Sequence, residues 1–265
     1  MAVLCTKRGD EVHFHHGFNY ESRGHSVEFL IRAALERYPT RKDFDLHVHT
    51  TDHFEGQFSF SSELGNYDDL FPCYLYHCWP ETGLLDYTET VNALPNTPPE
   101  TDKLGWIGSP QQPERAQFCE RAKTHPRFEG TLITWNRANP ARLDQNTSTF
   151  MTFQQQVARW QYLIDFAGYG YSARTKLLLS SPRIVFIVDR PWKEWFYPHM
   201  APWKHYIPVR RDLADLEENF QRVDSDPDMQ VFIRTHQREF AQRYLTRDAA
   251  VCRVAEIIDR IGYRP

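Results

Sequence analysis

No part of the 265-residue sequence approaches the roughly 20 consecutive apolar residues that a membrane-spanning helix needs. The first residues, MAVLCTKRGDEVHFHH, contain no apolar segment of the kind found in signal peptides. The last residues, GYRP, do not form a retention signal. These absences predict a cytoplasmic chain with no membrane span.

The sequence also lacks a regular arrangement of cysteine. Its five cysteines are scattered, and no two have the CxxC spacing of a zinc site. An odd number without a spacing pattern also argues against a disulfide framework. The net charge is small, at −4, so no general attraction to nucleic acid or to anionic membranes is expected. Any anion that this protein binds must therefore occupy a local site.

The composition is that of a folded protein, with 41% apolar and 25% charged residues. The length suits one large domain or two of ordinary size. Aromatic residues are abundant, at 14%. Their rings can stack on the faces of sugars or bases, but burial in the core accounts for most aromatic side chains.

In the first half, apolar residues recur at helical spacing over residues 26–38, with Ser26 as the expected N-cap and Pro39 as the stop. Residues 44–49 alternate between apolar and polar, which predicts a strand. Residues 80–113 are rich in Pro, Gly, Asn and Thr and are typical of a linker or long excursion. A domain boundary is therefore expected near residue 103.

The second half has a sharper pattern. An apolar strand (162–166), a glycine turn, a short helix expected to be capped by Ser172 (172–179) and a second apolar strand (183–188) form a βαβ unit, which implies a parallel sheet. Residues 205–209 predict a further strand. Amphipathic helices are expected at 212–223, 229–245 and 247–261. The predicted architecture is two α/β halves with a helical C-terminus.

The segment GYGYSARTK (168–176) is the first candidate site. Its glycines let the main chain approach a ligand, and the helix that follows presents free N–H groups at its start. Arg174 adds a planar donor suited to phosphate oxygens. Together these features indicate a diphosphate site at the carboxyl end of a strand. The alternative is a plain glycine turn with a solvated arginine.

The segment DLHVHTTDH (45–53) permits two interpretations. His47 and His49 lie on the same side of a strand and, with Asp52 and His53, resemble the start of a metal-dependent hydrolase site. Such a site needs further ligands at later strand ends, and the later histidines mostly fall in loops or helices. The other interpretation needs only Asp52, as a carboxylate general base at a strand tip.

A third segment, residues 191–213, is rich in Trp and Pro. This composition predicts an ordered, packed loop that could form one wall of a binding site and flank a base or a sugar.

Residues 160–220, WQYLIDFAGYGYSARTKLLLSSPRIVFIVDRPWKEWFYPHMAPWKHYIPVRRDLADLEENF, closely resemble the C-terminal signature of glycosyltransferase family 90. A weaker resemblance covers WIGSPQQPER (106–115), which is similar to the family's GSRTSPER-type segment. The segment SVEFLIRAALERYPTRKDFDLHVHTTDHF is similar to the helix and strand that precede its RDYP-type segment. In all, the resemblance spans residues 24 to 260.

The resemblance implies a GT-B-like α/β fold, in which two Rossmann-type domains face each other across a cleft. An N-terminal domain (1–103) would bind the acceptor and a second domain (104–245) the nucleotide-sugar. A C-terminal helix (246–265) would pack back on the first domain. The chain would be an inverting glycosyltransferase that uses a UDP-sugar, with xylose slightly favoured over glucose. Its acceptor would be a glycan or glycoprotein, and a viral or microbial intracellular member would fit.

By position, the resemblance assigns Asp52 as the catalytic base. The donor-binding residues would be Ser109, Arg115, Ser172, Ala173 and Arg174. The sequence departs from the family's pattern at Thr51, where an arginine usually precedes the aspartate, and at Pro110, which replaces the arginine of GSR. No DxD-like metal motif is well placed, so the resemblance predicts metal independence and no cofactor.

Overall fold

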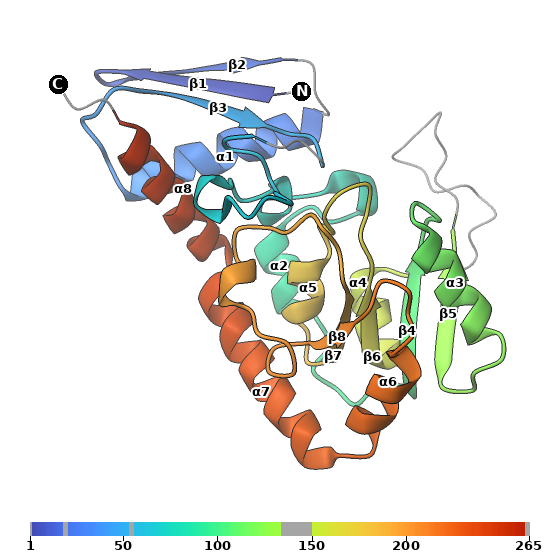
Figure 1. Cartoon of the computed structure of the whole chain (residues 1–265). Helices are drawn as coiled ribbons and strands as arrows, with labels where there is room; N and C mark the ends of the chain where they lie inside the picture. The colour runs from blue at the N-terminus through green and yellow to red at the C-terminus, as the bar shows by residue number, and fades with distance from the viewer. Residues whose placement is uncertain (1, 18–20, 53–55, 134–149, 263–265) are drawn as a thin grey trace.

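A computed structural model of the protein describes residues 2–17, 21–52, 56–133 and 150–262 (Figure 1). Two sheets form its framework. A three-stranded sheet has the order β2-β1-β3, and a five-stranded sheet has the order β5-β4-β6-β7-β8. The strands are β1 (Ala2–Arg8), β2 (Glu11–His16), β3 (Phe44–His49), β4 (Thr101–Gly108), β5 (Phe128–Leu132), β6 (Trp160–Asp165), β7 (Ile184–Val188) and β8 (Ile207–Val209).

Helices cover both sheets. The α-helices are α1 (Glu21–Arg37), α2 (Tyr87–Asn92), α3 (Pro113–Ala122), α4 (Phe153–Arg159), α5 (Thr175–Leu179), α6 (Leu216–Asp224), α7 (Pro227–Tyr244) and α8 (Arg247–Ile261). The single-turn 3-10 helices are η1 (Tyr67–Asp69), η2 (Tyr74–Tyr76), η3 (Pro80–Thr82) and η4 (Tyr197–His199).

The three-stranded sheet is antiparallel throughout. The prediction of a Rossmann-type sheet in the N-terminal half is therefore wrong. The physical reason is the turn between β1 and β2, which is only Gly9 and Asp10, with Gly9 at a φ of +54°. A two-residue connection can join antiparallel strands, whereas parallel strands need a crossover of a dozen residues or more. Helices α1 and α8 pack on one face of this sheet (Figure 1).

The five-stranded sheet is parallel throughout, as the predicted βαβ unit requires. Along β6 and β7, alternate side chains enter two different buried clusters. Leu163 and Val185 pack with residues of α5, α8 and the N-terminal half, whereas Ile164 and Phe186 pack with residues of α3 and α6. Both faces of the sheet are thus covered, as is typical of open α/β folds. The first cluster also joins the two halves of the chain.

Most predicted elements are present with shifted ends. Strand 44–49 and helix 247–261 are confirmed at the stated residues. The helix predicted from Ser26 begins at residue 21, so Ser26 is not a cap. Its side chain is buried inside α1 and its hydroxyl lies 3.1 Å from Nδ1 of His77.

The segment predicted as a linker contains α2 and all of β4, and residue 103 lies inside β4. The strand was hidden because Gly105 interrupts its apolar pattern. Packing requires a glycine at this position, because a Cβ at residue 105 would lie 1.8 Å from the indole of Trp160 on the neighbouring strand.

Candidate active site

The strand order of the parallel sheet predicts a ligand-binding crevice at one place. From β4 the chain passes outward to β5, and the later strands β6, β7 and β8 lie on the other side of β4. The strand order therefore reverses between β4 and β6. In open α/β sheets, ligands bind at the carboxyl ends of the strands beside such a switch point. The segments that follow β4 and β6 are those that contain the predicted donor-binding residues.

Two arginines approach Trp106 of β4 at this crevice. The guanidinium carbon of Arg115 lies 5.5 Å from the Trp106 ring centroid, and that of Arg174 lies 5.7 Å from it. Arg115, in the first turn of α3, donates to the carbonyl oxygens of Ser109 (2.8 Å) and Ala167. Arg174 donates to the Ile107 carbonyl (2.8 Å). The ends of β4 and β6 are thus held together by these side chains.

Each of these arginines has a buried nitrogen that makes no hydrogen bond to the residues that the structure describes. These nitrogens are Nε of Arg115 and Nη2 of Arg174, and the second lies 3.7 Å from Oδ1 of Asp165. Burial and the charge of Arg174 lower the pKa of Arg115 to about 9, and burial also lowers the pKa of Arg174. Both side chains remain cationic at neutral pH. The crevice therefore holds positive charge that an anion would stabilise.

Asp165, the last residue of β6, supplies the counter-charge. Its carboxylate is fully buried and accepts hydrogen bonds from Ser172 Oγ (2.8 Å), Thr175 Oγ1 (2.6 Å) and Arg190 Nη1 (3.0 Å). Arg174 lies 3.7 Å away. Burial alone would raise the pKa of Asp165, but the charges of Arg190 and Arg174, with the two hydroxyl hydrogen bonds, lower it below its usual range.

These contacts change the roles expected in the loop that precedes α5. Ser172 does not cap the helix, because α5 begins at Thr175 and the Ser172 hydroxyl donates to Asp165. The carbonyl of Ala173 accepts from Nζ of Lys176 (3.0 Å). Lys176 also forms a 2.8 Å ion pair with Glu194, and both of these side chains are buried. Buried charged side chains, namely Asp165, Lys176 and Glu194, therefore fix the loop that precedes α5.

Asp52 lies on the N-terminal half, three residues after β3. Its carboxylate forms an ion pair with Arg23 of α1 (2.9 Å), and about a quarter of its side chain is exposed. Arg23 also donates to the Thr50 carbonyl (2.9 Å) and stacks over the Tyr74 ring, with 4.6 Å to its centroid. The Asp52 carboxylate is thus held in one orientation while its surface stays accessible.

Tyr171 connects the Asp52 region with the crevice. It directly precedes Ser172, is buried, and packs edge-on against Phe60. Burial raises the pKa of Tyr171, and Cys73, Tyr74 and Asp52 raise it further. Phe60 also packs edge-on against Tyr74, over which Arg23 lies, so ring contacts link Tyr171 with the ion-pair partner of Asp52.

The predicted site residues thus fall into two groups. Ser109, Arg115, Ser172, Ala173 and Arg174 lie together at the switch point, whereas Asp52 lies on the N-terminal half beside Arg23. The structure adds Arg23, Asp165 and Arg190, which the sequence interpretation missed. Asp165 had a signal, because it is a carboxylate at the carboxyl end of a buried strand. Arg23 had none, because its helix position is typical of a solvated residue.

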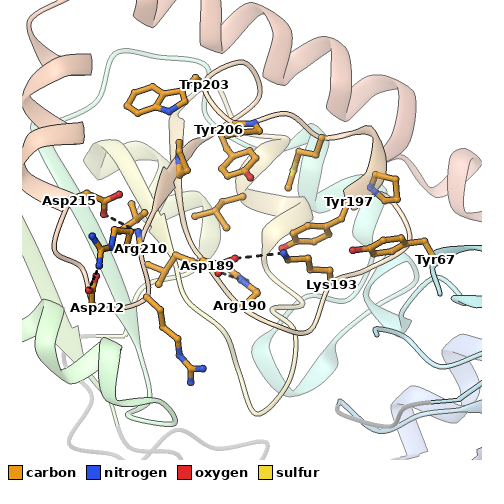
Figure 2. A pocket seen from close by; sticks show the side chains of 18 residues that line it. Tyr67, Asp189, Arg190, Lys193, Tyr197, Trp203, Tyr206, Arg210, Asp212 and Asp215 are labelled. Atoms are coloured by element: carbon orange, nitrogen blue, oxygen red, sulfur yellow. Dashed lines mark hydrogen bonds and ion pairs between the residues drawn. The ribbon is translucent and has the colours of Figure 1, made fainter. Parts of the chain in front are cut away.

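Two cavities lie at the carboxyl ends of the parallel strands. A small one of about 120 Å³ lies between the start of α3, the end of β6 and the segment after β7, and Ala167 and Gly170 line it. A larger one of about 810 Å³ lies at the carboxyl ends of β7 and β8. The two share lining residues, including Asp189 and Arg190. In Figure 2, Tyr67 and Tyr197 lie on one side of the larger pocket and Arg210 and Asp212 on the other.

The histidine pair of β3 is present on one side of the strand, with ring centroids 4.7 Å apart. His53 lies outside the described residues. Within the described ranges, no group of three or more His, Cys, Asp or Glu side chains could hold a metal ion. Among the same residues, the search for a helix with the length and apolarity to cross a membrane finds none.

The fold is that of an α/β protein with a parallel sheet, and two buried arginines lie at the switch point of that sheet. The chain belongs to glycosyltransferase family 90, whose family model matches residues 22–262.

Named relatives agree with this assignment. The chain is 26% identical over 257 residues to human protein O-glucosyltransferase 1, a match that covers 88% of this chain and 65% of the relative. It is 28% identical over 175 residues to human protein O-glucosyltransferase 3, covering 60% and 32%. It is 26% identical over 215 residues to the O-glucosyltransferase rumi homolog of Anopheles gambiae, covering 72% and 52%. The chain thus spans about two thirds or less of the length of these relatives.

We predict that Asp165→Asn destabilises the protein by about 3–5 kcal/mol at neutral pH, because it leaves buried guanidinium groups without a counter-charge. The pKa of Asp165 is lowered on folding, so its stabilising contribution is present above the ordinary aspartate pKa of about 3.9 and is lost as the pH falls through the lowered value. The free energy of unfolding should therefore decline less steeply on acidification in the variant than in the wild type.

Urea unfolding at a series of pH values measures this effect. Asp189→Asn is the matched control, because Asp189 follows the neighbouring strand β7 but is exposed and lies 3.7 Å from Lys193. Its effect should stay within about 0.5 kcal/mol. Equal effects of the two substitutions would contradict the role given to Asp165.

Proposed function

We propose that this protein is a glycosyltransferase that moves a sugar from a UDP-sugar to a hydroxyl of a glycan or glycoprotein. The observation that carries the proposal is the pair of arginines at the switch point. Among the residues that the structure describes, each of Arg115 and Arg174 has a buried nitrogen without a hydrogen-bond acceptor, at the switch point where a diphosphate would be expected. Membership of family 90 and relatives named as protein O-glucosyltransferases support the same activity.

The arginines would stabilise the leaving group. When the bond between the sugar and the diphosphate breaks, negative charge increases on the diphosphate oxygens. Arg115 and Arg174 are already held in place by the carbonyls of Ser109 and Ile107, so they need little reorganisation as that charge develops. Arginine suits this task because its planar donors match phosphate oxygens and it keeps its charge.

Asp52 would act as the general base. In an inverting displacement, its carboxylate removes the proton of the acceptor hydroxyl as that oxygen attacks the anomeric carbon from the face opposite the diphosphate. The Arg23 guanidinium orients the carboxylate, in a chain where Thr51 rather than arginine precedes the aspartate. The first half of the chain would thus supply the base, and the switch point of the second half would bind the donor.

The relatives favour glucose as the transferred sugar. Their names specify glucosyltransferases, whereas the sequence interpretation leaned towards xylose. The two donors differ by one hydroxymethyl group, which a pocket distinguishes by about 1–3 kcal/mol. We therefore propose UDP-glucose as the first donor to test, with UDP-xylose beside it.

Asp52→Asn should lower kcat by about 10²- to 10⁴-fold, the usual contribution of a general base, while the affinity for UDP changes little. Turnover of the UDP-sugar and calorimetric titration of UDP measure the two effects. Asp45→Asn is the matched control, because Asp45 lies on the preceding strand, is exposed and pairs with Arg8 (2.8 Å). Wild-type turnover in Asp52→Asn would exclude this residue as the base.

Arg174→Ala should weaken UDP binding by roughly 10- to 150-fold, the loss expected for charged hydrogen bonds of about 1.5–3 kcal/mol. Calorimetry with UDP measures the loss directly. Arg121→Ala provides the control, because Arg121 lies on α3 with Arg115 but pairs with Glu217 (2.8 Å). An unchanged UDP affinity in Arg174→Ala would remove this arginine from the donor site.

We also propose that the reaction needs no metal ion, because the arginines supply the positive charge. Turnover should stay within about twofold of its starting value after dialysis against EDTA, since no metal-bound phosphate contact would be lost. Loss of turnover that returns on adding Mg²⁺, Mn²⁺ or Zn²⁺ would contradict this proposal. A return with Zn²⁺ alone would favour the hydrolase interpretation of His47 and His49.

A further inference from the structure

The large pocket at the ends of β7 and β8 is separate from the arginine crevice. Its lining contains no residue of α3 and none of the loop 167–174. The small cavity lies between the two, because it includes Ala167 and Gly170 as well as residues shared with the large pocket. A ligand in the large pocket would therefore not contact the side chains that would hold a diphosphate. Its volume of about 810 Å³ falls in the range of small-molecule sites.

The walls of this pocket are rich in aromatic rings. Tyr67 comes from the N-terminal half, and Tyr197, Trp203 and Tyr206 come from the segment between β7 and β8 (Figure 2). Among the described residues, the hydroxyls of the three tyrosines have no hydrogen-bond partner. Such rings offer an apolar face and a polar tip to the same ligand.

The backbone at Trp203 is strained. Its φ is +61°, a left-handed conformation that is rare for a bulky residue. The turn is held because Trp203 N donates to the Tyr206 carbonyl (2.8 Å), and Arg222 stacks on the indole with 4.1 Å to its centroid. Strain of this kind persists only where the surrounding structure enforces it, and it gathers at ligand sites.

The charged groups of the pocket are paired with one another or with neighbours. Lys193 lies 3.7 Å from Asp189, and Arg210 lies 2.7 Å from Asp212. Arg211 pairs with Glu114, and Arg190 pairs with Asp165. The pocket therefore lacks the uncompensated positive charge of the crevice. This lining suits a neutral ligand rich in hydroxyl groups better than a phosphate.

The pocket is also connected with the Asp52 segment. Ser61 Oγ donates to the Asp52 carbonyl (3.2 Å), and the next residue, Ser62, pairs with Lys193 through two backbone hydrogen bonds of 3.0 and 2.9 Å. Lys193 lines the pocket. A ligand that extends from this pocket along the Ser62–Lys193 pairing would approach the carboxylate proposed as the base.

From these features we propose that the pocket binds a neutral saccharide, the part of the acceptor that does not react. The inference rests on the proposed function, because it assumes that Asp52 faces an acceptor. The proposal restricts the acceptor to molecules that contain at least one sugar besides the group whose hydroxyl reacts. The rings of Tyr67, Tyr197 and Tyr206 stack on the apolar faces of the sugar, and their hydroxyls bind its oxygens.

The test measures binding of four neutral trisaccharides, namely maltotriose, cellotriose, xylotriose and mannotriose, by calorimetry or ligand-observed NMR. At least one should bind the wild type. Each tyrosine hydroxyl contributes one hydrogen bond, so Tyr67→Phe should weaken that binding about fivefold and Tyr197→Phe with Tyr206→Phe about twentyfold. These changes keep the rings and so preserve packing. Tyr38→Phe, at the end of α1 and partly exposed, is the control.

UDP titration of the same variants separates the alternatives. An unchanged UDP affinity together with weakened trisaccharide binding supports the proposal. Binding of none of the four trisaccharides to the wild type overturns it. A loss of UDP affinity in the paired tyrosine variant also overturns it, because the pocket would then hold the nucleoside of the donor. If UDP fails to bind the wild type, the proposed donor site is wrong, whatever the trisaccharide result.

Discussion

The buried carboxylate of Asp165 is the contact on which the candidate site depends. It accepts from Ser172 and Thr175 and so fixes the loop between β6 and α5, and it pairs with Arg190 after β7. Its single negative charge faces Arg174 and Arg190, while Arg115 lies beside Arg174 at the Trp106 ring. One carboxylate cannot neutralise three guanidinium groups. The remaining positive charge is therefore available to an anion, and it is held in place before the anion arrives.

The packing of the two halves explains how a carboxylate on one can act with arginines on the other. A single buried cluster includes Val48 of β3, Tyr74 of η2, Leu178 of α5 and Val254 of α8. Helix α8 packs on α1 and β3, so the end of the chain returns to its beginning (Figure 1). Because this core is continuous, close packing fixes the N-terminal half, which contains Asp52, against the loop that contains Tyr171.

Periodicity predicted the elements whose packing is local, and resemblance predicted the residues of the site. Strand 44–49 and helix 247–261 were predicted correctly because each presents one regular apolar face. Strand β4 was missed because the requirement for Gly105 comes from Trp160, more than 50 residues later. The antiparallel N-terminal sheet was missed because β2 exposes polar residues on one side and only partly buries the other.

The same limit applies to the site. That Arg174 belongs to a ligand site could be inferred from its place after a glycine turn, but its partner Asp165 and the distant Arg23 could not be inferred from spacing. Ser172 was expected to cap a helix on the basis of residue type, yet a buried carboxylate competes for its hydroxyl and wins because an ionised acceptor makes the stronger hydrogen bond. Long-range charge pairing, rather than local pattern, decides such roles.

The crevice and the large pocket differ in charge, and this difference determines which kind of ligand each would favour. Within the described part of the chain, two buried arginine nitrogens of the crevice make no hydrogen bond. In the pocket, the charges are paired and the tyrosine hydroxyls have no hydrogen-bond partner among the same residues. An anionic ligand gains most in the first environment and a neutral, hydroxyl-rich ligand in the second. If the two ligands exchanged places, the arginines would lack an anion and the diphosphate would lie beside Asp189 and Asp212. In the reaction that we propose, this charge pattern would orient the donor and the acceptor, with the Ser62–Lys193 pairing and Asp52 on the acceptor side.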